Sequence, residues 1–427
     1  MSWRRIGLVG LLPLLLAGSA GAQAPGRLNV VLEGEAGARD DGNYGLQQDQ
    51  ALQQSRTVGR AGFNLQLSYA LERLSLALGY SPYYERTLDG SGLSGTTHRL
   101  DFGLVGDLNR QLRLNVRENL ISTPDIDLYA PVTTTETTVV TRHGNQLSHL
   151  LDVSLDQTFG RHASMILGVT HSLRRYEDVN LYDSETLGGR LGAAFELARG
   201  SRVEAALGVA RYDYRQRGSS DVRTVGVAYA TDLGRDNHLR VEAGAYSEDS
   251  TLRPVISQVD GFTAVRESDT GWRGGLQFAR DERLFHWTLG ASHDISPGAG
   301  LGRAVTADNG FLGLSTAIGR RLTLGLDGNV SRQRDLPHQG PAGTSDSQTL
   351  TRFAAGTVRA GWSFAPAVRL EGGYSRIWQR AQVAPFANLS YSRYYMNLAF
   401  RLYSSGETPL EPASLGRPTT DEKSDHQ

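Results

Sequence analysis

The chain has 427 residues, among them 50 Gly, 14 Pro and no Cys, with 39% hydrophobic and 21% charged residues and a mean hydropathy of -0.35. This composition excludes a disulfide scaffold, a site built on thiolates and a helical membrane protein. The 44 basic and 45 acidic residues nearly cancel, so the charge balance does not favour a nucleic-acid partner. Lys423 is the single lysine, so nearly every positive charge is a guanidinium.

Residues 1–22 are predicted to be a cleaved signal peptide. Arg4 and Arg5 form a positive start, and the apolar segment from Ile6 to Ala17 is too short to span a bilayer. Ala20-Gly21-Ala22 then fits the small-x-small cleavage pattern. We expect the mature chain to begin at Gln23 and to leave the cytoplasm; an uncleaved anchor or a buried segment is the alternative.

From Leu28 to Tyr403 the chain alternates between large apolar residues and small or polar ones. The pattern is clear in 73–80, 112–117 and 322–327. A period of two places one set of side chains on each face of a strand. Counting these segments gives about eighteen strands, with sixteen possible, in a domain that spans residues 23–403. Residues 404–427, which are polar and rich in Pro, Glu and Asp, are predicted to be a disordered periplasmic tail.

The connections between these segments are of two kinds. Short turns such as Gly160-Arg161-His162 and Gly319-Arg320-Arg321 alternate with longer polar loops such as 122–144 and 335–347. Short turns on one side and long loops on the other are typical of outer-membrane barrels, whose turns are periplasmic. We therefore expect an all-β fold, a transmembrane antiparallel up-and-down β-barrel in the Gram-negative outer membrane.

The polar face of these strands carries many charges. An arginine at the lipid midplane costs ~2–4 kcal/mol, so this face is expected to line a hydrated lumen. A soluble β-sandwich or a secreted propeller is the rival fold. The long strands and the aromatic residues near strand ends, such as those at 80, 83 and 84, 362 and 364, and 394 and 395, favour the membrane. The predicted pore-lining residues are Arg60, Arg73, Arg99, Arg113, Arg117, Arg190, Arg240, Arg273, Arg359 and Arg369.

A barrel of sixteen to eighteen strands leaves an aqueous channel unless it is plugged. Small inward residues, such as Gly168 and Gly208, would leave free volume for a hydrated solute. The arginines suit an anionic solute, such as a polymer of sugar acids; alternatively, they pair with carboxylates across strands and only brace the wall. Tyr212, Tyr214 and Tyr246 either stack on sugar rings or pack at the rim.

Two strand–turn–strand units, Leu100–Leu114 and Thr316–Leu324, resemble those of outer-membrane β-barrel porins encoded in exopolysaccharide biosynthesis and export gene clusters of Gram-negative bacteria. The resemblance implies a conduit that exports polysaccharide together with periplasmic and inner-membrane export components. It supplies no catalytic residues. The last strand, Tyr395–Tyr403, looks like the terminal signal recognised by the outer-membrane barrel assembly machinery.

Other functions stay open at this point: a general solute porin, a structural or assembly barrel, or an outer-membrane barrel hydrolase. A hydrolase would need a nucleophile such as Ser292 near His286 or His293. The histidines are scattered, and a spacing of seven places His286 and His293 on opposite faces of a strand. We therefore expect no catalytic residue, metal site or cofactor.

Overall fold

The computed structural model describes residues 27–42, 55–88, 94–124, 145–177, 181–215, 217–252, 265–282, 284–298, 302–336, 349–381 and 388–404. The predicted signal peptide at 1–22 lies outside these residues, as does all of the predicted tail at 404–427 except Ser404. Within the described ranges, no helix combines the length and the apolar character needed to cross a membrane.

The described residues form one antiparallel sheet of eighteen strands, the number expected from the alternation. The strands are β1 (Arg27–Asp41), β2 (Arg56–Ala70), β3 (Leu74–Thr87), β4 (Ser94–Asp107), β5 (Leu112–Thr123), β6 (Gln146–Phe159), β7 (Ala163–Tyr176), β8 (Ser184–Ala198), β9 (Ser201–Tyr214), β10 (Gly218–Asp232), β11 (Asn237–Leu252), β12 (Val265–Asp281), β13 (Phe285–Ser296), β14 (Val305–Ile318), β15 (Leu322–Asp335), β16 (Thr349–Ala365), β17 (Val368–Ala381) and β18 (Leu389–Ser404).

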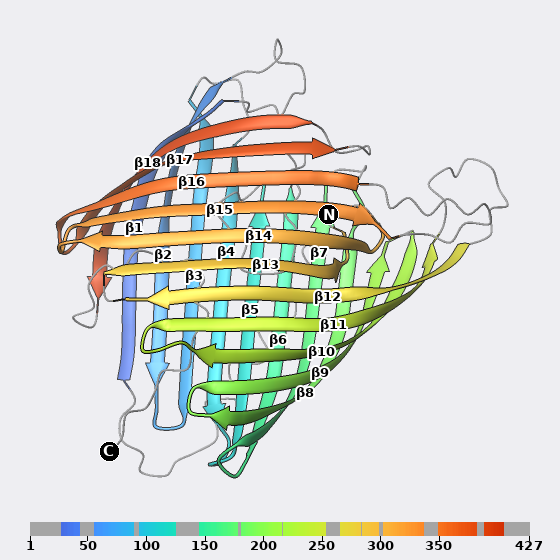
Figure 1. The fold of residues 1–427 in the computed structure, drawn as a ribbon. Helices are drawn as coiled ribbons and strands as arrows, with labels where there is room; N and C mark the ends of the chain where they lie inside the picture. Colours follow the sequence, from blue (N-terminus) through green and yellow to red (C-terminus); the bar gives the residue numbers. More distant parts are fainter. Residues whose placement is uncertain are drawn as a thin grey trace, which may run out of the picture.

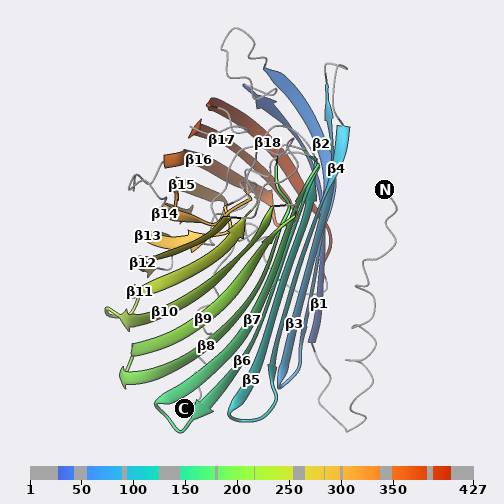
Figure 2. The same ribbon diagram turned by 90° about the vertical axis from the view of Figure 1, so that its right-hand side faces the viewer.

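The sheet is closed into a barrel (Figures 1 and 2). Each strand pairs with its neighbours in the sequence, and β1 pairs with both β2 and β18. A closed sheet has no free edge, so its backbone groups are satisfied internally and it can cross a bilayer. The strands are 12 to 17 residues long, more than the ~9–11 residues that a tilted strand needs to span the membrane.

Tight turns join the strands at one end of the barrel. The predicted turns at 160–162 and 319–321 connect β6 to β7 and β14 to β15. Gly160 and Gly319 have φ angles of 66° and 65°, a left-handed conformation that strains any residue with a Cβ. The connections at the opposite end are mostly longer. This asymmetry, predicted from the sequence, assigns the tight turns to the periplasmic side.

Large aliphatic side chains cover the outer face of the barrel. Leu167, Leu207 and Val358 are 51%, 57% and 54% exposed, because no second layer of structure packs on them. Trp362 and Phe364 lie on the same face, close to the periplasmic end of β16. An apolar outer band with aromatic residues at its borders is the surface that a bilayer covers. The chain is therefore an outer-membrane β-barrel in contact with lipid.

Two tyrosines of the expected aromatic girdles lie instead on the inner face. Tyr83 is beneath the guanidinium of Arg60, with 5.0 Å between the guanidinium carbon and the ring centroid. Tyr395 is buried and donates a hydrogen bond of 3.4 Å to Glu371. Assigning both to the lipid interface was wrong, because adjacent residues of a strand point to opposite faces.

Candidate pore and its lining

The predicted pore-lining arginines divide into two groups. Arg73 belongs to the exposed turn between β2 and β3. Because β3 begins only at Leu74, this arginine lies at the periplasmic rim and not on a strand. The others alternate with outward aliphatic residues and lie on the inner face. These are Arg60, Arg99, Arg113, Arg117, Arg190, Arg240, Arg273, Arg359 and Arg369.

Six of these inner arginines are paired with carboxylates, which lie on the same strand, on a neighbouring strand or, for Arg240 of β11 and Glu204 of β9, two strands away. Arg273 lies between Glu242 and Asp294, with 2.9 Å from its Nη2 to an oxygen of each. The other pairs are Arg60 with Glu35, Arg113 with Asp107 at 2.9 Å, Arg240 with Glu204 at 2.9 Å, Arg359 with Asp327 at 3.2 Å, and Arg369 with Glu371 at 2.6 Å. This pairing matches the alternative in which the arginines brace the wall, since each positive charge faces a negative one.

Arg190 differs from these residues. It is exposed on the inner face of β8, opposite Gly168 of β7 and Gly208 of β9. Within the described ranges no carboxylate lies within ion-pair distance of its guanidinium. Gly188 and Gly192 are the next inward residues of its own strand. Because its neighbours have no side chains, the Arg190 guanidinium is accessible from the lumen.

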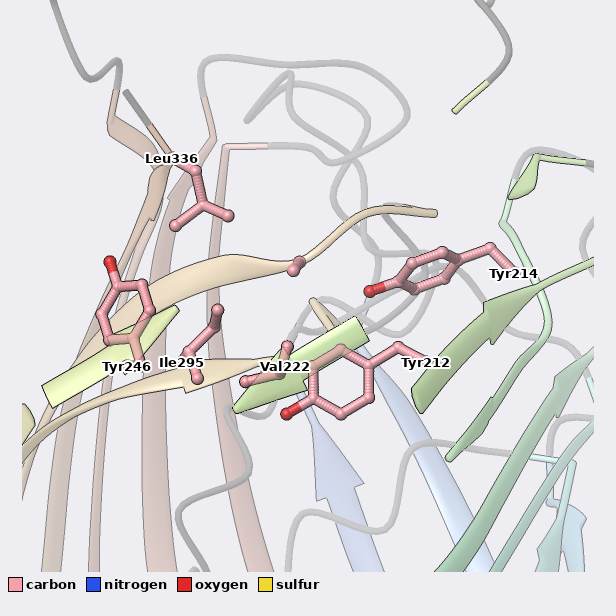
Figure 3. Close-up of a cluster of buried hydrophobic side chains, with 7 residues drawn as sticks. Tyr212, Tyr214, Val222, Tyr246, Ile295 and Leu336 are labelled. Atoms are coloured by element: carbon pink, nitrogen blue, oxygen red, sulfur yellow. The ribbon is translucent and has the colours of Figure 1, made fainter. Parts of the chain in front are cut away.

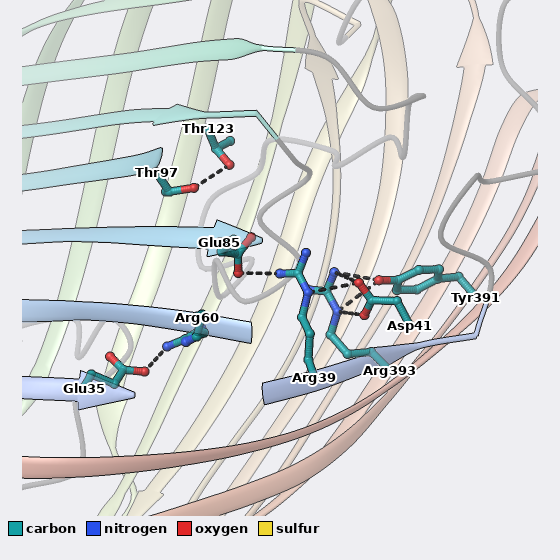
Figure 4. Close-up of polar contacts among 9 residues, drawn as sticks. All are labelled: Glu35, Arg39, Asp41, Arg60, Glu85, Thr97, Thr123, Tyr391 and Arg393. Atoms are coloured by element: carbon teal, nitrogen blue, oxygen red, sulfur yellow. Dashed lines mark hydrogen bonds and ion pairs between the residues drawn. The ribbon is translucent and has the colours of Figure 1, made fainter. Parts of the chain in front are cut away.

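A buried ionic network joins three strands near the extracellular end (Figure 4). Arg39 of β1 donates to Asp41 at 2.9 Å and to Glu85 of β3 at 2.7 Å. Arg393 of β18 donates to both oxygens of the same Asp41, at 2.7 and 3.3 Å, and to the hydroxyl of Tyr391. The network therefore connects the first and last strands of the barrel through charge-assisted hydrogen bonds, the stronger kind in proteins.

An apolar cluster occupies the lumen at the same end (Figure 3). Tyr212 and Tyr214 of β9, Val222 of β10 and Tyr246 of β11 pack with Ile295 of β13; Ala304 and Leu336 complete the cluster. The three tyrosines are 7%, 2% and 5% exposed. Their rings therefore pack against other side chains and are not presented to a solute. Of the two roles considered from the sequence, packing at the rim fits the structure and stacking on sugar rings does not.

The β13–β14 hairpin reaches this cluster because its end leaves the wall. Pairing of β13 with β12 stops at His293, opposite Gly274, whereas pairing with β14 continues to Ser296, opposite Val305. Val305 is fully buried. Beyond His293 the hairpin thus bends inward and contacts inner-face residues of β9 and β10, four and three strands away in the sheet.

The tip of the hairpin touches the connection between β7 and β8. A Cβ at Gly302 would lie 2.7 Å from the ring of Tyr182, and Gly302 has a φ of 68°. Arg217, in the connection between β9 and β10, lies over the same Tyr182 ring, with 5.2 Å from its guanidinium carbon to the ring centroid. The hairpin therefore narrows the extracellular part of the lumen. The local alternation of the sequence contains no signal for this contact.

The residues considered for a hydrolase are not assembled into a site. Ser292 and His293 point to opposite faces of β13. His293 is bonded to Asp308 at 2.6 Å and its ring stacks on Trp272 at 4.1 Å, whereas His286 is bonded to Asp281 at 3.2 Å near the periplasmic end. Among the residues whose placement the structure gives, no three metal-binding side chains converge.

No protein-family model matches the chain, and no curated protein matches it. Crystal structures of outer-membrane proteins are similar to it at low identity. OccK2 (OpdF) of Pseudomonas aeruginosa is 11% identical, with 88% of this chain and 98% of that chain covered and a TM-score of 0.43. OccAB1 of Acinetobacter baumannii is 10% identical, with 88% and 97% covered and a TM-score of 0.43. OpdK of Pseudomonas aeruginosa, crystallised with vanillate, is 12% identical, with 90% and 100% covered and a TM-score of 0.42.

Proposed function

We propose that the protein is a passive channel that lets hydrated polar solutes cross the outer membrane. The observation that carries this proposal is the closed wall of eighteen strands whose inner face bears charged residues. A barrel of this size is wide enough to hold water, and glycines such as Gly103, whose missing side chain would meet nothing within 4 Å, keep it open. Diffusion through such a lumen requires no cofactor and no catalytic residue.

The charge pattern favours solutes that are polar and not strongly charged. Paired arginines and carboxylates present hydrogen-bonding groups to the lumen while their opposite charges largely cancel at a distance. Arg190 is the exception and supplies a positive charge to which an anionic group can bind. The bend of the β13–β14 hairpin sets the size limit at the extracellular entrance.

Export of an exopolysaccharide is the second candidate. It is supported by the resemblance of the units Leu100–Leu114 and Thr316–Leu324 to porins of export gene clusters, and by a lumen rich in groups that hydrogen-bond to sugars. In this role the polymer, the periplasmic and inner-membrane export components and the barrel assembly machinery are the proposed partners. A cleaved signal at 1–22 and a periplasmic tail at 404–427 are part of the same proposal.

Reconstitution separates these functions from a closed structural barrel. The purified mature protein in planar bilayers should give stepwise ion conductance, and in liposomes it should admit small sugars. A barrel that inserts but conducts no ions would contradict the channel. Deletion of the gene tests export: polymer retained in the periplasm supports it, whereas normal polymer release with slower uptake of small sugars supports the general porin.

A further inference from the structure

Three arginines lie side by side on the outer surface of β15, β16 and β17. Arg332 is directly opposite Arg352, and Arg352 is directly opposite Arg380. Two residues closer to the periplasm, the same face carries Val330 on β15 and Trp378 on β17, which are 58% and 44% exposed. The arginines therefore face outward, away from the lumen, on the surface that meets the membrane.

Carboxylates of the described strands do not balance Arg352 and Arg380. Arg352 and Arg380 are exposed, and within the described ranges neither has a carboxylate partner. A fourth outward arginine, Arg376 of β17, donates to the hydroxyl of Ser390 at 3.4 Å. Arg332 differs from Arg352 and Arg380, because Asp308 of β14 lies directly opposite it; Asp308 is also bonded to Arg334 at 2.7 Å. Like charges directly opposite each other destabilise a sheet, so Arg352 and Arg380 call for an anion from outside the described strands.

The height of the row matches the border of the outer leaflet. At ~3.3 Å per residue and a tilt of ~40°, Arg332 is about 25 Å and Arg352 about 33 Å above the periplasmic ends of their strands. The apolar band of such barrels is ~25 Å tall. Trp378 lies just below the row, at the level where an aromatic girdle is expected. The arginines are thus placed where headgroups of the outer leaflet begin.

Two outward arginines of β9 and β10 at this end of the barrel have acidic partners. Arg211 of β9 lies 3.1 Å from Asp213 and 3.8 Å from Asp221. Arg223 of β10 lies 3.6 Å from Asp249 of β11. The directly opposed arginines of β16 and β17 therefore differ from the outward arginines of β9 and β10, whose charges are balanced by acids of the chain.

We propose that Arg352, Arg376 and Arg380 form a binding site for the phosphate groups of a phosphorylated glycolipid in the outer leaflet. A guanidinium binds phosphate oxygens through two parallel hydrogen bonds, and a phosphate between Arg352 and Arg380 removes their mutual repulsion. The acyl chains of the same lipid would pack on Val330 and Trp378. The site depends on the barrel fold and not on which solute passes through the lumen.

The test measures lipid bound to the detergent-solubilised mature protein by native mass spectrometry. The probes are lipid A with two phosphates, the same lipid without phosphate, and inorganic phosphate as competitor. We expect bisphosphorylated lipid A to bind, and R352Q/R380Q to weaken this binding at least about tenfold. The matched control R211Q/R223Q removes two outward arginines that have acidic partners and should bind lipid A like the wild type.

Folding is checked by the heat-dependent shift of the barrel in electrophoresis, and R352K/R380K should retain most of the binding because it keeps both charges. Equal binding of phosphorylated and dephosphorylated lipid, or equal loss in R211Q/R223Q, would overturn the proposal. Displacement of the lipid by equimolar inorganic phosphate would also overturn it, because the site would then recognise free phosphate and not a lipid headgroup.

Discussion

Arg393 and Asp41, which are 352 residues apart in the sequence, form a two-pronged ion pair between the last and the first strand of the barrel. Both side chains are almost completely inaccessible to water, at 1% and 0% exposed. The pair therefore fixes the register between β1 and β18, which are neighbours in the sheet but not consecutive in the sequence.

Replacing Asp41 by asparagine should destabilise this seam. The substitution leaves the buried guanidinium of Arg393 without its counter-charge, and breaking a buried pair in this way costs ~3–5 kcal/mol. We expect a lower free energy of unfolding in urea and a lower temperature for the electrophoretic shift from folded to unfolded barrel.

The matched control is Asp107→Asn, which breaks the pair with Arg113. These side chains are 42% and 47% exposed, so the effect should be below ~1 kcal/mol. Equal losses of unfolding free energy in the two variants would show that the buried Asp41–Arg393 pair stabilises the barrel no more than an exposed pair does.

Glu118 and His149 form an ion pair on the outer face of β5 and β6. The carboxylate is 3.1 Å from Nε2 of the ring, and Glu118 is surrounded by outward apolar residues, with Phe102 and Leu151 directly opposite it. At ~3.3 Å per residue and a tilt of ~40°, it lies about 15 Å above the periplasmic end of β5, within the apolar band.

His149→Leu should lower the free energy of unfolding in lipid by ~1–3 kcal/mol, because it leaves an unsatisfied carboxyl group facing the membrane. Replacing both residues by leucine should bring the free energy of unfolding back toward that of the wild type, since an apolar pair replaces a polar one. A double variant that is less stable than His149→Leu would mean that the pair contacts water or protein and not lipid.

Arg190→Gln should make the channel less selective for anions. The substitution removes an inner-face charge that no carboxylate of the described strands balances, so the local potential becomes more negative. We expect the permeability ratio of chloride to potassium to fall by about twofold in planar bilayers at low salt, with a smaller change in molar salt.

Removing a neutral pair provides the comparison. The double variant Arg60→Gln/Glu35→Gln removes one positive and one negative charge that form an ion pair with each other. The net charge of the lumen is unchanged, so the permeability ratio should stay near that of the wild type. If both variants change the ratio equally, selectivity depends on the general shape of the lumen and not on Arg190.

Weakening the apolar cluster should widen the entrance. Ile295→Ser/Leu336→Ser places two hydroxyls among buried tyrosines, which loosens the bent end of the β13–β14 hairpin. We expect a larger single-channel conductance and faster uptake of sugars by liposomes. Val58→Ser, which changes a buried inner-face residue of β2 outside this cluster, should leave the conductance unchanged.

The parts of the structure that follow from local rules could be predicted from the sequence. Alternation gives the strands, and adjacent residues such as Val358 and Arg359 already differ in character, so their faces are evident. The failures arise where the local pattern is ambiguous. Arg73 continues the alternation of β3 but lies in the turn, and Tyr83 and Tyr84 look alike although they point to opposite faces.

Contacts between distant strands could not be predicted. The seam between Asp41 and Arg393 requires closure of the whole barrel, and the packing of Ile295 against Tyr212 requires β13 to leave the wall. Pairing of an inner arginine with a carboxylate depends on the register between strands, which single-strand patterns do not set. For this reason the sequence suggested a lumen rich in arginine, whereas the structure gives mostly paired charges and leaves Arg190 as the exception.

The chain contains no cysteine, so an introduced cysteine provides the only thiol in the protein. The most direct test of the barrel places single cysteines in turn at Thr357, Val358, Arg359 and Ala360 of β16 and measures their reaction with a water-soluble maleimide in liposomes. Inner residues at 357 and 359 should react quickly and outer residues at 358 and 360 slowly, because water reaches one face and lipid covers the other. Equal reactivity at all four positions, or the opposite alternation, would contradict a hydrated channel enclosed by a lipid-facing wall.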